Sequence, residues 1–230
     1  MQKSISSKKK WRHPHWTRLF TRSNTTAAKQ WHKVVPHLKI KPKVFLDIGT
    51  GEWGSEAWEV KKTHPDCKII GFEPQPDRFK LLKKHNYPGK LLPFVIYKAN
   101  TIVDGYMGHP EGKSDFWLFA QNQHPDAYKK IKIESYTLDN IEKKYGPFHD
   151  LFLWADVEGS ELSVLQGATR LFNENKIIGV NVEVRKTAIG PGACTEDEII
   201  SFMKAKNFIQ IPHNQTTKHY DIIFIPDGNN

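Results

Sequence analysis

The sequence lacks any run of about 18 consecutive apolar residues, so it predicts no transmembrane helix. It also lacks a cysteine framework, because its two cysteines, Cys67 and Cys194, lie far apart in a chain of 230 residues. The N-terminus has no apolar segment of the kind that a secretory signal requires. These absences exclude a membrane-spanning or disulfide-stapled protein, and they predict a cytoplasmic protein with two free thiols.

Acidic residues are absent from the first 46 positions, which hold twelve of the 34 lysines and arginines. From Asp47 onward 22 basic residues accompany 25 acidic ones, so the whole net charge of +9 originates in the N-terminal part. Such a segment can bind a polyanion, for example a nucleic acid, an anionic membrane or an acidic glycan, or it can serve solubility alone. We expect residues 1–35 to form a basic, loosely ordered extension with one short helix near 26–35, and residues 36–230 to form a single domain.

From Lys43 onward, short apolar runs alternate with helical stretches, which is typical of βαβ units on a parallel sheet. Strands are expected at 44–48, 67–72, 91–97, 150–155, 177–184, 208–211 and 221–225, with further extended segments at 115–119 and 131–136. Helices are expected at 52–63, 76–86, 138–145, 161–173 and 195–206, and an irregular region at 100–113. The pattern predicts an α/β fold: a doubly wound sheet of about seven strands with helices on both faces, the last strand antiparallel in a C-terminal hairpin. A ligand pocket is expected at the carboxyl ends of the strands.

A glycine-rich turn follows the first expected strand and reads D-I-G-T-G-E-W-G over residues 47–54. Glycines at such a turn let the backbone approach a ligand without an intervening Cβ atom. Glu73 ends the next strand, 24 residues after Gly49, where a carboxylate can accept hydrogen bonds from both hydroxyls of a ribose. Together the turn and Glu73 predict a cofactor that contains a nucleoside.

The charge of Asp47 narrows the kind of cofactor. A carboxylate directly before the glycine turn would repel the pyrophosphate of a dinucleotide. S-adenosylmethionine carries no phosphate, and its ammonium and sulfonium groups are positive, so an acid at this position favours it; a residue that only braces the loop is the alternative. The adenine is expected between the loops that follow the second and third strands. The predicted cofactor-binding residues are Asp47, Gly49, Thr50, Gly51, Gly54, Glu73, Pro74, Ala99, Asn100 and Asp156.

Four blocks of the sequence resemble the FkbM-type methyltransferases. They are the loop at 47–54, F-E-P-Q-P at 72–76, T-L-D at 137–139, and D-V-E-G-S-E-L-S-V-L-Q-G-A at 156–168. The resemblance covers about residues 43–225 and implies a Rossmann-like class I methyltransferase sheet. It also implies methyl transfer from S-adenosylmethionine to a hydroxyl, often on sugars, glycolipids or polyketide-type products. The chain departs from the family in one extra loop residue and in Trp154-Ala155, where many members have Lys-Ile.

Acidic side chains close the strand that leads into the last of these blocks. If the strand continues to Glu158, alternation places Asp156 and Glu158 on one face, beside the cofactor. They can stabilise a sulfonium, bind the acceptor hydroxyl and take its proton, or together hold a divalent cation. Asp156 is therefore predicted as the central catalytic residue and Glu158 as its partner. Glu183, at the end of the next strand, is a third candidate, with an ion pair to Arg185 or Lys186 as its alternative role.

The acceptor is predicted only as a class. O-methylation of a sugar, a glycan or a small hydroxylated metabolite follows from the resemblance. A nucleic-acid methyltransferase is the alternative, with residues 1–33 binding backbone and bases through their basic and aromatic side chains. A non-catalytic binding module on the same fold is a third interpretation, against which the intact glycine loop and acids argue.

Overall fold

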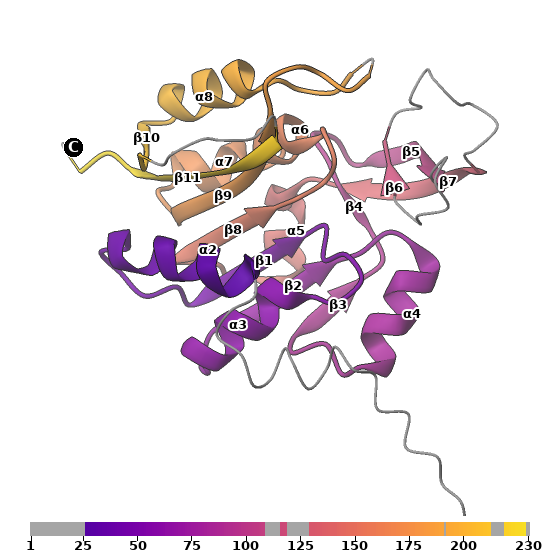
Figure 1. Ribbon diagram of the computed structural model, residues 1–230, viewed down its shortest axis with the longest axis horizontal. Helices are drawn as coiled ribbons and strands as arrows, with labels where there is room; N and C mark the ends of the chain where they lie inside the picture. The colour runs from indigo at the N-terminus through magenta and orange to yellow at the C-terminus, as the bar shows by residue number, and fades with distance from the viewer. Residues whose placement is uncertain (1–25, 109–115, 119–128, 191, 213–218, 229–230) are drawn as a thin grey trace, which may run out of the picture.

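The computed structural model describes residues 26–108, 116–118, 129–190, 192–212 and 219–228 (Figure 1). Its main sheet has seven strands in the order β10-β11-β9-β8-β1-β2-β3. These strands are β1 (Val44–Ile48), β2 (Lys68–Phe72), β3 (Lys90–Leu92), β8 (Leu151–Ala155), β9 (Ile177–Arg185), β10 (Phe208–Gln210) and β11 (His219–Pro226). Strand β11 runs opposite to the other six strands of this sheet. The predicted doubly wound α/β sheet, with its last strand antiparallel, is confirmed.

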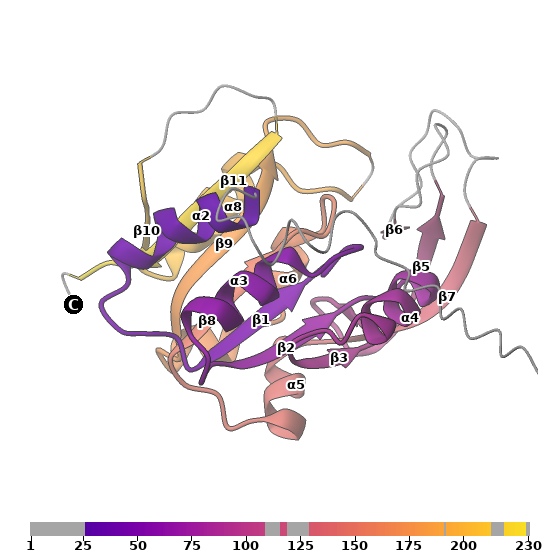
Figure 2. The ribbon, with the colours of Figure 1, turned by 60° about the horizontal axis from the view of Figure 1, so that its bottom comes forward.

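Helices cover both faces of the main sheet (Figure 2). They are α2 (Thr26–Val34), α3 (Ser55–Thr63) and α4 (Pro76–Lys84) on one face, and α5 (Leu138–Tyr145), α6 (Glu161–Gln166), α7 (Thr169–Asn173) and α8 (Glu196–Ala205) on the other, with a short 3-10 helix η1 (Val35–His37). Each face has its own hydrophobic core. The start of α8 has a capping box, formed by Thr195 and Glu198.

Helix α2 belongs to the packed domain, although the sequence placed it in the loosely ordered extension. Trp31 and Val34 are fully buried, and the Trp31 indole N–H donates to Thr63 Oγ1 at 2.8 Å. The Trp31 ring packs edge-on against Phe45 and Phe152 of the sheet. The predictions for the basic segment at 1–25, including binding to nucleic acid, lie outside the described residues.

A second, four-stranded sheet follows β3 and has the order β4-β7-β5-β6. Its strands are β4 (Val95–Ile96), β5 (Thr101–Met107), β6 (Phe116–Trp117) and β7 (Lys129–Tyr136). The sequence had predicted one strand at 91–97, where the structure has two, and an irregular region at 100–113, where residues 101–107 form β5 and residues 109–113 lie outside the described residues. Pro93 separates β3 from β4, because proline has no N–H to continue a ladder. Strand β5 was missed because Asp104 and Gly105 interrupt its apolar pattern; the Phe116 ring covers Gly105, where a Cβ atom would lie 2.5 Å away.

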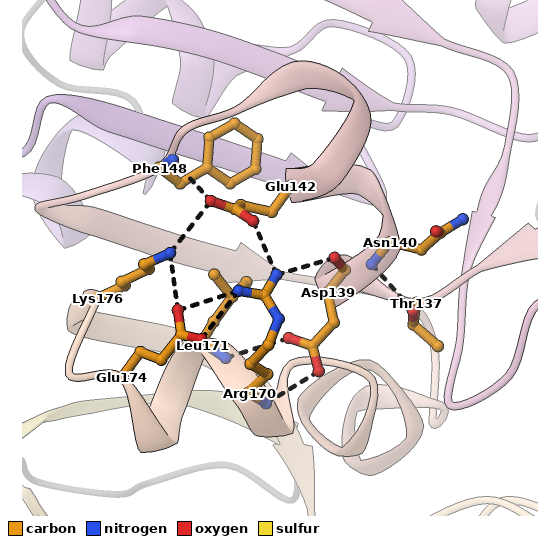
Figure 3. Close-up of polar contacts among 9 residues, drawn as sticks. All are labelled: Thr137, Asp139, Asn140, Glu142, Phe148, Arg170, Leu171, Glu174 and Lys176. Atoms are coloured by element: carbon orange, nitrogen blue, oxygen red, sulfur yellow. Dashed lines mark hydrogen bonds and ion pairs between the residues drawn. The ribbon is translucent and has the colours of Figure 1, made fainter.

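The expected helix at 161–173 is two helices, with a break at Gly167. A Cβ atom at Gly167 would lie 2.4 Å from the carbonyl oxygen of Tyr97, so this position requires glycine. The T-L-D segment organises the same region (Figure 3). Thr137 Oγ1 accepts a hydrogen bond from the Asn140 amide at the start of α5, and the Asp139 carboxylate accepts from two amides at α7. This family motif therefore serves the fold.

Ion pairs join α5 to α7 beside the T-L-D segment (Figure 3). The carboxylate of Glu142 accepts from Arg170 Nη2 at 2.7 Å, from Lys176 Nζ at 3.2 Å and from the Phe148 amide at 3.2 Å. Burial alone would raise the pKa of Glu142, but these donors hold it down at about 2. Glu142 is therefore a charged, buried tie between the two helices.

Candidate functional site

A cavity opens at the carboxyl ends of β1, β2 and β8, where the sequence placed the ligand pocket. Its volume is about 650 Å³, including the open mouth. Its walls come from both sheets, from α4 and from the turn after β8. The lining residues are Ile48, Gly49, Gly51, Phe72, Glu73, Pro74, Arg78, Phe94, Val95, Ile96, Phe116, Leu118, Asp156, Val157, Glu158 and Ser160. The lining thus includes the glycine loop and Glu73 together with the acidic turn.

The glycine loop needs its glycines for two different reasons. Gly49 has a φ of +84°, and a Cβ atom there would lie 1.8 Å from the carbonyl oxygen of Asp156, so the loop and the end of β8 could not approach each other with any other residue. Gly51 has a φ of +67° and faces open space. A bare backbone that faces a cavity can lie directly against a ligand.

The carboxylate of Glu73 is fixed at the end of β2 by two backbone amides. Gly51 donates to Glu73 Oε2 at 3.0 Å, and Gln75 donates to Oε1 at 2.9 Å. Burial raises the pKa of Glu73 to about 7, against the opposing effects of these amides and of the Arg78 charge. Each oxygen retains a lone pair for a further donor, so this carboxylate can accept from a ribose diol as the sequence predicted.

Asp47 does not line this cavity. Its side chain lies below the glycine loop, where Asp47 Oδ2 accepts a hydrogen bond from the buried Tyr87 hydroxyl at 2.9 Å. Burial, followed by the charge of Glu56, raises the pKa of Asp47 well above its usual range. Thr50 also points inward and donates to the carbonyl oxygen of Phe72 at 3.2 Å. The electrostatic argument built on Asp47 therefore applies instead to Glu73 and Asp156, which do line the cavity.

Gly54, Ala99 and Asn100 also lie away from the cavity lining. Gly54 packs against the Tyr87 ring, where a Cβ atom would come within 2.9 Å. Asn100 Oδ1 accepts from the Thr137 amide at 2.9 Å, and the Ala99 carbonyl accepts from Ser135. Ala99 and Asn100 do not reach the cavity because the third strand breaks at Pro93. Because the third strand of the main sheet ends at Leu92, the residues that reach the cavity are 94–96.

Three acids predicted as catalytic lie together beside the cavity. Asp156, Glu158 and Glu183 each offer a carboxylate oxygen within 4.8 Å of the others. Asp156 is accessible from the cavity. Its pKa is nevertheless raised well above the usual range, first by desolvation from the surrounding protein and then by the negative charges of Glu183 and Glu158. Such a carboxyl group is a stronger base once ionised than an ordinary aspartate.

The turn that carries Asp156 and Glu158 is held in place by the side chain of Glu161. Glu158 has a φ of +56°, which is uncommon for a residue other than glycine. Glu161 Oε1 accepts from the amides of Val157 and Gly159 at 3.1 and 3.0 Å and so holds the turn. Glu161 also begins α6, where an acid complements the helix dipole, so it stabilises both the helix and the turn.

Sequence reasoning missed several residues of the site. Phe94, Phe116 and Leu118 line the cavity; the segments at 91–97 and 115–119 were expected to be extended, but no residue pattern indicated that they face the ligand pocket. Tyr87 was missed because a single tyrosine after a helix gives no sign that it reaches back under the loop. Arg185 had been considered only as a possible partner of Glu183; it lies closer to Glu158, at 2.9 Å against 3.6 Å.

The order of the main sheet and a cavity at this edge define the fold of a class I methyltransferase. A family model described as methyltransferase FkbM domain matches residues 47–209, so the chain belongs to the FkbM methyltransferase family. Among the described helices, none has the length and apolar character that a bilayer span requires.

Known proteins agree with this assignment. The chain is similar to the 2-O-methyltransferase NoeI of Sinorhizobium fredii (strain NBRC 101917 / NGR234), with 23% identity over 171 residues that cover 68% of this chain and 70% of that protein. Among solved structures, it is similar to the delta-N METTL16 MTase domain, with a TM-score of 0.52, 9% identity, and coverage of 88% and 82% of the two chains. Crystal form 2 of the METTL16 MTase domain gives a TM-score of 0.51, 11% identity, and coverage of 90% and 71%. At such low identity the structural likeness shows the fold.

Proposed function

We propose that this chain is an S-adenosylmethionine-dependent O-methyltransferase that acts on a hydroxyl of a sugar, a glycan or another small metabolite. One observation carries the proposal: a single cavity is lined by a glycine loop, by the Glu73 carboxylate, and by the acids Asp156 and Glu158. The first pair suits a nucleoside, and the second suits a positive methyl donor and a hydroxyl. Support for a hydroxyl acceptor comes from the relative that is named a 2-O-methyltransferase.

The residues of the cavity fit this cofactor. Glu73 would accept from the ribose hydroxyls, the bare backbone at Gly51 would lie against the ligand, and the apolar side chains of Phe94, Val95 and Ile96 would flank the adenine. When bound, S-adenosylmethionine supplies a methyl group on a sulfonium sulfur. The acids Asp156 and Glu158 favour a sulfonium over a phosphate, and a bound sulfonium would in turn favour the ionised form of Asp156.

The chain itself contributes alignment and a proton acceptor. The ionised carboxylate of Asp156 would accept the proton of the acceptor hydroxyl, and the cavity would hold that hydroxyl toward the methyl group that S-adenosylmethionine supplies. A base in this position contributes about 10²- to 10⁴-fold to such a rate. Correct orientation of the hydroxyl toward the methyl group supplies the larger part of the catalysis.

Two measurements test the proposal. Calorimetry should show binding of S-adenosylmethionine to the wild-type protein, and incubation with the labelled cofactor and separate glycan, lipid and RNA pools should label a glycan or small-molecule fraction. Asp156→Asn should lower turnover by about 10²-fold or more. The matched control is Asp66→Asn, because Asp66 is exposed in the turn between α3 and β2, at the opposite edge of the sheet.

The outcomes separate the alternatives. Absence of cofactor binding would reject the methyltransferase assignment for this chain. Binding without transfer to any pool would favour a non-catalytic module, and label in RNA alone would favour the nucleic-acid alternative. Unchanged turnover in Asp156→Asn would remove Asp156 from the catalytic role.

A further inference from the structure

Arg185 lies against the acidic cluster from the end of β9. Its Nη2 atom is 2.9 Å from Glu158 Oε2 and 3.6 Å from Glu183 Oε2. The side chains are largely withdrawn from water, with exposed fractions of 23% for Arg185, 30% for Glu158 and 13% for Glu183. One guanidinium therefore faces two of the three acids, and this pairing is partly shielded from solvent screening.

The same three acids have the composition of a divalent-cation site. Oxygen ligands from Asp156, Glu158 and Glu183 lie within 4.8 Å of one another, and carboxylate oxygens are what Mg²⁺, Mn²⁺ and Ca²⁺ prefer. A metal ion would need these oxygens at about 2.0 to 2.6 Å. Two of the three carboxylates already give an oxygen to Arg185. A metal ion would therefore have to displace the guanidinium or be held beside a like charge.

A second feature of Arg185 concerns the kind of ligand that the site accepts. Its Nε atom is buried and has no hydrogen-bond partner within the part of the chain that the structure describes. A buried N–H group without a partner is unfavourable, and a metal ion cannot accept its hydrogen bond. The lining of the cavity does not include Arg185, and an added cation at this cluster would leave the buried Nε–H as unsatisfied as it is now.

We propose that Arg185 is the resident cation of the Asp156–Glu158–Glu183 cluster, so that the site works without a divalent metal. In this role Arg185 is a positioning residue: it pairs with Glu158 and Glu183 and holds them in place beside Asp156, which lines the cavity. Glu161 stabilises the same arrangement, because it accepts hydrogen bonds from the amides on either side of Glu158. The assignment of this cluster to methyl transfer rests on the proposed function; the occupation of the cation position by Arg185 does not.

Binding of Mn²⁺, followed by electron paramagnetic resonance of the free ion, tests the proposal without cofactor or acceptor. Arg185→Met removes the charge and keeps much of the apolar stem, whereas Arg185→Lys keeps a charge. We expect no stoichiometric site in the wild-type protein or in Arg185→Lys. In Arg185→Met we expect one Mn²⁺ per chain, bound at least tenfold more tightly than by the wild type, and its loss when Glu183→Gln is added.

Lys186→Met is the matched control, because Lys186 is the exposed neighbour of Arg185, and it should behave as the wild type. Stoichiometric Mn²⁺ binding by the wild type that Asp156→Asn abolishes would overturn the proposal. So would a folded Arg185→Met variant, checked by circular dichroism, that gains no affinity. If Arg185→Met does not fold, the titrations of the wild type and of Arg185→Lys decide. Loss of wild-type transfer activity in EDTA would also overturn it, whereas failure to bind S-adenosylmethionine would reject the proposed function alone.

Discussion

Glu56 is a half-buried acid whose ionisation should destabilise the protein near neutral pH. It lies in the first turn of α3, and burial followed by the negative charge of Asp221 raises its pKa from 4.5 to about 7. The charge of Glu56 in turn raises the pKa of Asp47 under the glycine loop. Asp221 is itself the end of a buried hydrogen-bond chain, in which Gln30 donates to Asn181 and Asn181 donates to Asp221.

The size and sign of the effect follow from the two pKa values. Between pH 4.5 and about 7 the unfolded chain has already released the Glu56 proton and the native protein still holds it, so the free energy of unfolding falls as the pH rises. At about 1.36 kcal/mol per pKa unit, the full difference is roughly 3 kcal/mol, which is an upper limit because neighbouring acids titrate together with Glu56. Glu56→Gln cannot ionise. Its stability relative to the wild type should therefore increase by up to about 3 kcal/mol between pH 4.5 and pH 8.

Urea denaturation of both proteins at several pH values between 4.5 and 8 measures this difference. Glu52→Gln is the control, because Glu52 is an exposed acid only four residues earlier in the chain. The reasoning is refuted if the stability difference between Glu56→Gln and the wild type does not change with pH. A difference that grows toward low pH would mean that the sign is wrong.

Three further predictions concern Glu73 in the cavity, the hydrogen bond between Tyr87 and Asp47, and the ion pairs of Glu142. Glu73→Gln should weaken binding of S-adenosylmethionine by about 10- to 100-fold above pH 7, because hydrogen bonds to a charged group contribute about 1.5–3 kcal/mol. The wild-type affinity, measured by calorimetry, should fall as the pH drops through about 7, whereas that of the variant should stay flat. Tyr87→Phe keeps the ring but leaves Asp47 without its donor, and urea denaturation should show a loss of about 1–3 kcal/mol, with an unchanged stability counting against the buried bond. Glu142→Gln should lower the free energy of unfolding by about 2 kcal/mol at pH 7, since Arg170 and Lys176 lose a charged partner but are themselves partly exposed. This difference should shrink as the pH falls toward 2, where the wild-type carboxylate also becomes protonated.

The location of the site could be predicted because it depends on topology more than on side-chain detail. Parallel strands bring their carboxyl ends to one edge of the sheet, so the glycine loop, Glu73 and Asp156 could be expected to meet there. Four predicted cofactor residues besides Asp156 do line the cavity: Gly49, Gly51, Glu73 and Pro74. The cluster of Asp156, Glu158 and Glu183 follows from the same rule, because β8 and β9 are adjacent.

The direction of Asp47 could not be predicted. All five residues of β1 are buried, so the apolar pattern does not distinguish its two faces. Only the packing of Tyr87 under the loop shows that Asp47 points away from the cavity.

The wall of the small sheet could not be predicted either. Its central strands β5 and β7 pair over residues about 30 positions apart, and two of the strands beside them, β4 and β6, are only two residues long. Local sequence patterns do not report pairings of this kind.

The burial of Trp31 limits how the basic N-terminal segment can be dissected. A truncation through residue 33 would remove this tryptophan together with the charged segment and expose Phe45 and Phe152 on the sheet. If RNA or glycan binding were lost after such a cut, a damaged domain and a missing charged contact would give the same result. A truncation that ends at residue 25 keeps α2 whole and removes 7 of the 34 lysines and arginines, so it is the cut that isolates the contribution of charge.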